Sequence, residues 1–269
     1  MIAAAVIVFR EVLEAALIVG IVLAATKGVD SSRRWIVAGI LGGLTGSAAL
    51  AASADLLSQA LAGMGQEMFN ASILTAAVAM LGWHTIWMSS HGREMAAEMK
   101  TVGHAVSMGS RPLTILALVV GVAVLREGAE TVLFVFGVSA SGGEGAAATA
   151  LGCALGLATG MAVGALLYAG LVAIPTRYLF TVTTWLVTLL AAGMAAQAVS
   201  YLAAAGLLDF ATQPLWDTSA LLAEDSIAGR LAHTLVGYVD RPSGSQLLAY
   251  AVTLAAITGL AKLNGRPTS

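Results

Sequence analysis

The feature that most constrains this chain is the recurrence of long apolar runs with few or no charges. The hydrocarbon core of a bilayer is about 30 Å thick and a helix rises about 1.5 Å per residue, so a spanning helix needs about 20 such residues. Of the 269 residues, 58% are hydrophobic and only 10% are charged, whereas soluble domains average about 25% charged residues. We therefore predict an all-α, polytopic membrane protein with a single transmembrane domain.

Seven runs have the required length, and we predict one transmembrane helix for each. They cover residues 3–25, 35–54, 71–89, 113–138, 147–174, 179–205 and 247–263. The first run lacks a basic leader and contains three charges, so we interpret it as a helix and not as a signal peptide. An odd number of helices puts the two termini on opposite sides of the membrane.

The basic residues indicate the orientation, because Lys and Arg favour the cytoplasmic ends of membrane spans. Nine of them lie in the first, third and fifth connections and the C-terminal tail, whereas Arg230 and Arg241 alone lie in the other connections. We therefore predict that the N-terminus is outside and the C-terminus inside. The long sixth connection has mixed polarity, which predicts a folded external segment, and the third is expected to continue a helix into the cytoplasm.

Apart from Lys262 at the end of the last range, the charged side chains inside the predicted helices are confined to two short motifs. Six of the 28 acidic and basic residues fall there, and they form REVLE at Arg10 to Glu14 and REGAE at Arg126 to Glu130. A charge at the bilayer centre costs about 2.5 to 3.5 kcal/mol. Residues three and four apart share one side of a helix, so each motif presents an arginine and two glutamates together. We predict that these residues are functional.

The two motifs also reveal an internal duplication. FREVLEAALIV aligns with LREGAETVLFV at an offset of 116 residues. With three helices per copy, the copies must run in opposite directions, as in transporters whose site lies near the midplane between inverted repeats. We assign repeat one to residues 1–105, repeat two to 112–206, the external segment to 207–245 and the seventh helix to 246–264. Glycines four apart, which permit close helix packing, follow each motif helix: Gly39, Gly43, Gly42, Gly46, then Gly152, Gly156, Gly160, Gly164.

If the repeats face each other, four carboxylates converge. Close carboxylates in a low-dielectric site stay ionised only when a cation or more protons arrive. A set of oxygen ligands disfavours copper(I) and a closed structural zinc site, and leaves iron, manganese, magnesium and calcium. We predict a transport site for a hard cation, with metal ligands Glu11, Glu14, Glu127 and Glu130 supported by Arg10 and Arg126.

Other readings of the same residues remain open. Each Arg-Glu pair could be a buried structural salt bridge, as in a structural or sensory seven-helix protein. A membrane di-iron oxidase would be expected to carry Glu-x-x-His motifs, and neither motif contains histidine. His84 and His91 lie on one predicted helix face, and the lack of a histidine on a second spanning helix disfavours haem. We therefore expect no enzymatic activity, no resident cofactor and, with a net charge of -2 and no basic run, no nucleic-acid partner.

Weaker candidates lie along a possible ion path. Two acidic residues on the cytoplasmic side could receive a departing ion, acids of the external segment could attract cations, and an amide could donate a neutral oxygen. Solvated helix ends, loop polarity and packing hydrogen bonds would explain them equally well. These pathway candidates are Glu94, Glu98, Asp217, Asp225 and Gln197.

The paired motifs resemble the REXXE motifs of the iron permease family, the oxidase-dependent iron transporters that include the fungal high-affinity permease and its bacterial EfeU-type relatives. HGREMAAEM and WDTSALLAEDSIAGRLAHTLVGYVDRPSG resemble bacterial members too. The resemblance implies iron as the transported substrate, the four glutamates as iron-binding positions, and a multi-pass protein of the bacterial inner membrane. It also implies a separate periplasmic iron-binding or oxidase partner. REGAE has Ala129 where many members have Leu, and this position is not a ligand. A carrier of another divalent cation, such as manganese, is the alternative.

Overall fold

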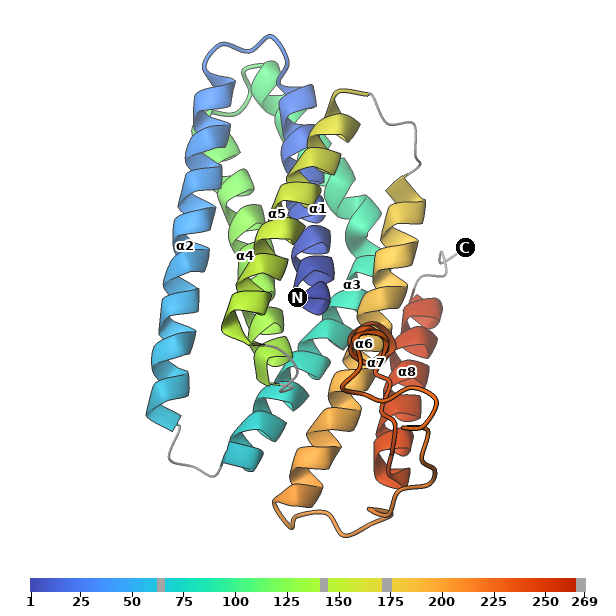
Figure 1. The fold of residues 1–269 in the computed structure, drawn as a ribbon. Helices are drawn as coiled ribbons and strands as arrows, with labels where there is room; N and C mark the ends of the chain where they lie inside the picture. The colour runs from blue at the N-terminus through green and yellow to red at the C-terminus, as the bar shows by residue number, and fades with distance from the viewer. Residues whose placement is uncertain (62–65, 141–144, 171–175, 265–269) are drawn as a thin grey trace.

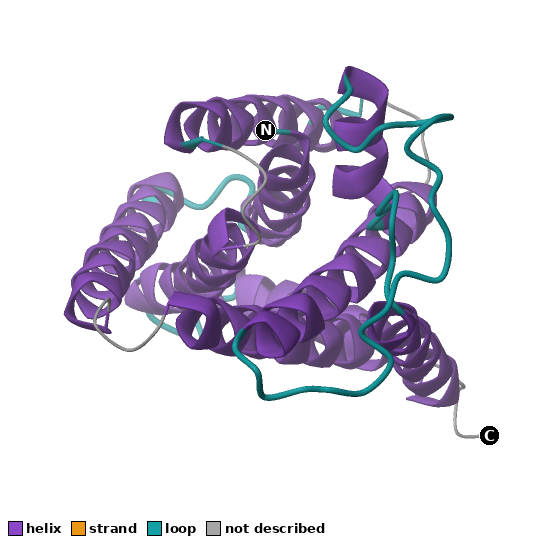
Figure 2. Ribbon diagram, turned by 60° about the horizontal axis from the view of Figure 1, so that its bottom comes forward, coloured by secondary structure: helices purple, strands orange, loops and turns teal. Residues whose placement is uncertain are grey.

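The computed structural model is a bundle of long helices (Figure 1). It describes residues 1–61, 66–140, 145–170 and 176–264, which contain no named strand (Figure 2). The all-α prediction is therefore confirmed for these residues. The helices are α1 (Ile2–Ala25), α2 (Ser32–Leu61), α3 (Gln66–Ser107), α4 (Thr114–Ala140), α5 (Ala146–Tyr168), α6 (Thr176–Ala204), α7 (Ile227–Val236) and α8 (Gly244–Asn264).

Five of these helices are long and apolar enough to cross a membrane. The candidate spans are Ser32–Ser53, Glu67–Met88, Ala146–Tyr168, Phe180–Ala204 and Gly244–Asn264. The other two long helices, α1 and α4, each contain the three charged residues of one motif. A long helix thus lies at each of the seven predicted ranges, and α7 is an additional short helix between α6 and α8.

The ends of two helices differ from the prediction. The fifth predicted range runs to residue 174, but α5 ends at Tyr168, and residues 171–174 lie outside the described part of the chain. Gly170 has φ +68° and donates its N–H to Leu167 O at 3.1 Å, a left-handed turn that ends a helix. The third helix is longer than its predicted span, because α3 has 42 residues and includes Glu94 and Glu98. The expectation that the third connection continues a helix is confirmed.

Glycine contacts hold the motif helices against their neighbours. α1 packs most extensively on α5, and α2 on α4. A methyl group built on Gly43 of α2 would lie 2.7 Å from Val124 Cβ and 2.8 Å from Gly121 O of α4. Gly156 of α5 is as tightly enclosed by α1, since its methyl group would lie 2.9 Å from Phe9 N. Only glycine allows backbones to approach this closely.

α1 and α4 run in opposite directions (Figure 1) and pack against each other. Two apolar clusters lie along these helices, one on each side of the motifs. The first includes Ile7, Leu74, Leu81, Phe134, Val138 and Met194. The second includes Val22, Ile36, Val106, Leu116, Val120 and Val124. Both motifs are therefore enclosed between apolar side chains.

The segment between α6 and α8 is folded, as its mixed polarity predicts. The side chain of Ser226 caps α7 by accepting from Gly229 N at 2.9 Å. The segment is tied to α8 by Tyr250, whose hydroxyl donates to Val236 O at 2.7 Å. Hydrogen bonds from Ser219 to the Asp217 carboxylate, together with the ion pair to Arg241, lower the pKa of Asp217.

The glycine contacts predict an asymmetry between two neighbouring positions. Gly43→Ala should destabilise the protein by about 1 to 3 kcal/mol, because the added methyl group meets α4 backbone. Gly42→Ala should be neutral or stabilising by up to about 1 kcal/mol, because its methyl group meets nothing within 4 Å and alanine favours helices. Thermal unfolding in one detergent would compare them. Equal melting temperatures for the two variants would contradict this packing.

Candidate metal centre at the crossing of α1 and α4

Each motif lies in the middle of its helix, and its residues are largely buried. Glu11 and Glu14 on α1 and Glu127 on α4 have side chains that are at most 4% exposed, and Glu130 is 14% exposed. Because α1 and α4 pack against each other, carboxylates from both helices meet where the helices cross.

Within each motif, the arginine pairs with both glutamates. Arg10 Nε lies 3.0 Å from Glu14 Oε1. Its Nη1 lies 3.6 Å from Glu11 Oε1. Arg126 repeats this pattern on α4, where its Nε donates to Glu130 Oε1 at 3.2 Å and lies 3.5 Å from the Glu127 carboxylate. The arginines therefore orient the carboxylates and offset part of their charge.

The two arginines differ in their surroundings. The side chain of Arg10 is 2% exposed, whereas that of Arg126 is 29% exposed. The Arg126 guanidinium lies 4.5 Å from the centre of the Trp87 ring and contacts the thioether sulfurs of Met88 and Met95 at 3.6 and 3.7 Å. The motif on α4 is therefore closer to the protein surface than the motif on α1.

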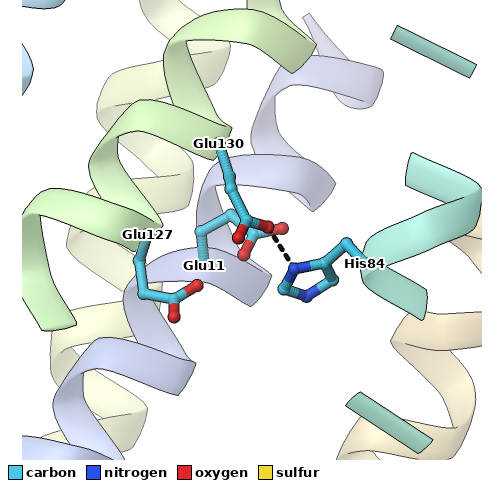
Figure 3. Close-up of side chains that lie close together, drawn as sticks. All are labelled: Glu11, His84, Glu127 and Glu130. Atoms are coloured by element: carbon cyan, nitrogen blue, oxygen red, sulfur yellow. Dashed lines mark ion pairs between the residues drawn. The ribbon is translucent and has the colours of Figure 1, made fainter. Parts of the chain in front are cut away.

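A histidine from a third helix completes the cluster, and the sequence analysis did not place it there. His84 of α3 is 4% exposed and contacts Glu130 through Nδ1 (Figure 3). Its Nε2 lies 3.6 Å from Glu14 Oε2. Its position inside an apolar span was the available signal, because ionisable residues within membrane helices usually have a function. Beside the carboxylate oxygens predicted from the motifs, this cluster therefore also offers an imidazole nitrogen.

Four residues place donor atoms where one cation could contact them all. Glu11, His84, Glu127 and Glu130 each offer an atom within 4.8 Å of the other three (Figure 3). Both oxygens of Glu11 and of Glu127 are buried and accept no hydrogen bond from the described residues. A buried carboxylate without donors is costly. A bound cation would remove this cost, so the donor set fits a metal ion.

The four acidic pathway candidates are not part of this donor group. Glu94, Glu98 and Asp225 are exposed. Asp217 forms an exposed ion pair with Arg241 at 3.0 Å. Gln197 is half-buried on α6. Glu14 touches the cluster from its edge, between Arg10 and His84.

Comparison with known proteins identifies the family. The model of the iron permease FTR1 family matches residues 1–263. The chain belongs to this family. The prediction from the paired motifs is thus confirmed, and the protein is a multi-pass membrane protein.

Individual members of the iron permease FTR1 family are similar over most of their length. The chain is 31% identical to the ferrous iron permease EfeU of Escherichia coli O157:H7, over 92% of this chain and 90% of the relative. The same figures hold for the ferrous iron permease EfeU of Shigella sonnei. That of Shigella flexneri is 32% identical over 70% of this chain and 80% of its own. These bacterial relatives fit an inner-membrane location, and no solved structure matches the chain significantly.

The different burial of the two arginines predicts unequal effects on stability. Arg10→Met should destabilise the protein by about 3 to 5 kcal/mol, because it leaves buried carboxylates without their partner. Arg126→Met should cost less, because Arg126 is partly exposed. Unfolding curves of the two variants in the same detergent would measure the difference. An equal or larger loss for Arg126→Met would contradict the assigned environments.

Proposed function

We propose that this chain is an iron uptake permease that binds iron ions between α1 and α4 and carries them across the membrane. The observation that carries the proposal is the set of buried carboxylate oxygens of Glu11 and Glu127 that lack hydrogen-bond donors among the described residues. Membership in the iron permease FTR1 family supports iron as the cargo. Relatives named ferrous iron permeases support the same choice. Glu11, Glu14, Glu127 and Glu130 would be the metal ligands, with Arg10 and Arg126 as supporting residues.

The proposal includes seven transmembrane helices, of which the first six form two inverted repeats, residues 1–105 and 112–206. Equivalent glycine contacts support the duplication. Gly156 faces Ala5 O, Phe9 N and Val8 Cβ of α1, and Gly43 faces Gly121 O, Leu125 N and Val124 Cβ of α4. Each atom near Gly156 has a counterpart of the same kind near Gly43, in a residue 116 positions later in the chain. The two motifs are separated by the same 116 residues. The external segment 207–245 and the seventh helix 246–264 would complete the domain.

An orientation with the N-terminus outside and the C-terminus inside is part of the same proposal. The connections after α1 and after α3 lie at the same end of the bundle (Figure 1). Lys27 and Arg111 lie in these connections, and basic residues favour the cytoplasmic side. Iron would then enter from the opposite end, and a separate periplasmic iron-binding or oxidase partner would supply it there.

The apolar clusters on both sides of the motifs favour alternating access over an open channel. Phe134 is fully buried on one side of the carboxylates, and Leu116 and Val120 are fully buried on the other. An ion held between them would leave only when one cluster separates. The membrane potential would assist inward movement by about 2.3 kcal/mol per charge per 100 mV.

The proposed site predicts opposite effects of one substitution on transport and stability. Glu127→Gln preserves the shape of the side chain and should lower iron uptake into proteoliposomes by more than about tenfold, because a charged ligand is lost. The same change should leave the melting temperature of the empty protein unchanged or higher, because it removes a buried charge.

Glu67→Gln is the matched control, because Glu67 is an exposed glutamate in the first turn of α3. This variant should transport iron at the parental rate. If instead Glu127→Gln keeps parental uptake and loses stability, the cluster is structural and the proposed site is wrong.

Two other functions would use the same carboxylates. A manganese carrier would show robust manganese uptake with no iron flux in the same proteoliposomes. A membrane di-iron oxidase is favoured by one observation, which is that His84 joins the cluster from α3 although neither motif contains histidine. Rapid oxygen consumption after addition of iron(II) to the purified protein would support the oxidase.

A further inference from the structure

The carboxylate cluster contains one nitrogen donor, and the structure holds it firmly in place. The His84 ring lies edge-on to Phe134, with ring centres 6.5 Å apart and planes at 79°. Its Nδ1 contacts Glu130. Its Nε2 is buried and accepts or donates no hydrogen bond among the described residues. An imidazole that is packed against Phe134 and holds a buried nitrogen 3.6 Å from the Glu14 carboxylate is suited to bind a metal ion.

Nitrogen and oxygen donors prefer different divalent ions. Imidazole suits iron, nickel, copper and zinc, whereas carboxylates and carbonyls suit magnesium, calcium and manganese. Affinity also rises along the first row from manganese to copper for a given site. We propose that His84 sets the metal selectivity of the cluster, favouring iron(II) and later first-row divalent ions over manganese, magnesium and calcium. This inference rests on the proposed function and adds a specificity-determining residue to it.

The internal duplication supplies this nitrogen only once. An offset of 113 residues superimposes Gly43 on Gly156, which face equivalent atoms of their partner helices. The same offset aligns three buried residues of α3 with three of α6: Leu74, Ala77 and Leu81 with Val187, Leu190 and Met194. It therefore aligns His84 with Gln197. Repeat two carries an amide where repeat one carries the imidazole, so the nitrogen donor belongs to α3 alone.

This alignment suggests the most informative variant. His84→Gln gives repeat one the same residue type that repeat two has at Gln197. It also replaces the imidazole nitrogen by an amide oxygen, so that all ligands would be oxygen atoms. In anaerobic binding assays with purified protein, the concentration of manganese that displaces half of the bound iron(II) should fall by about tenfold or more relative to the parent. Magnesium and calcium should displace iron(II) more readily as well.

His104→Gln is the matched control, because His104 is an exposed histidine near the end of the same helix. Its displacement curves should equal those of the parent. If His84→Gln also keeps the parental ratio of manganese to iron affinity, His84 does not set selectivity. A parent protein that binds no iron(II) at all would instead overturn the proposed function.

A second measurement does not depend on the folding of any variant. The parent protein would be loaded with copper(II) as a spin probe. Its electron spin echo decay should then be modulated by the nitrogen nuclei of a coordinated imidazole. Labelling of histidine with the heavier nitrogen isotope should change that modulation. Spectra without a nitrogen contribution would contradict the proposal.

Discussion

Four carboxylates buried where α1 crosses α4 impose the main physical constraint on this bundle. The two motif arginines offset only two of the four formal negative charges, and the interior offers little screening. The oxygens of Glu11 and Glu127 lack hydrogen-bond donors among the described residues. Such an arrangement is unfavourable unless the surroundings hold it together and a cation enters it. The packing described above supplies the first condition, and the proposed cargo supplies the second.

The glycine contacts explain how the helices can be held at this crossing. α5 lies against one side of α1 and α2 lies against one side of α4, at distances that a side chain would not permit. The remaining sides of α1 and α4 are then free to face each other and α3. Apolar clusters on both sides of the motifs leave Glu11, Glu14 and Glu127 almost fully buried. The same features therefore support the fold and create the low-dielectric site.

The two proposed repeats make equivalent backbone contacts but differ in the side chains around the motifs. Arg10 is buried and pairs with the two glutamates of its motif. Arg126 is more exposed and also contacts Trp87 and two methionines. His84 has no histidine counterpart on α6. An exact two-fold arrangement would offer an ion the same path in both directions. These differences distinguish the two sides of the cluster, and they lie on the α3 side, where α3 packs on both motif helices.

Much of this arrangement could be predicted from the sequence, and the misses have physical causes. Apolar runs of spanning length predicted the long helices, and the cost of buried charge singled out Glu11, Glu14, Glu127 and Glu130. The contribution of His84 was missed because α3 is apolar on most sides, and its periodicity does not show which face meets α1 and α4. Gly42 and Gly43 are likewise indistinguishable in sequence, although only Gly43 contacts α4. The end of α5 depended on one left-handed glycine, Gly170.

The central claim is that an iron ion binds at the crossing of α1 and α4. Diffraction data collected above and below the iron absorption edge, on crystals grown with iron(II), would locate the ion directly. The account predicts an anomalous peak within coordination distance of Glu11, Glu127, Glu130 and His84. An iron peak only at the exposed acids of the external segment or of α3, with none at the crossing, would contradict it.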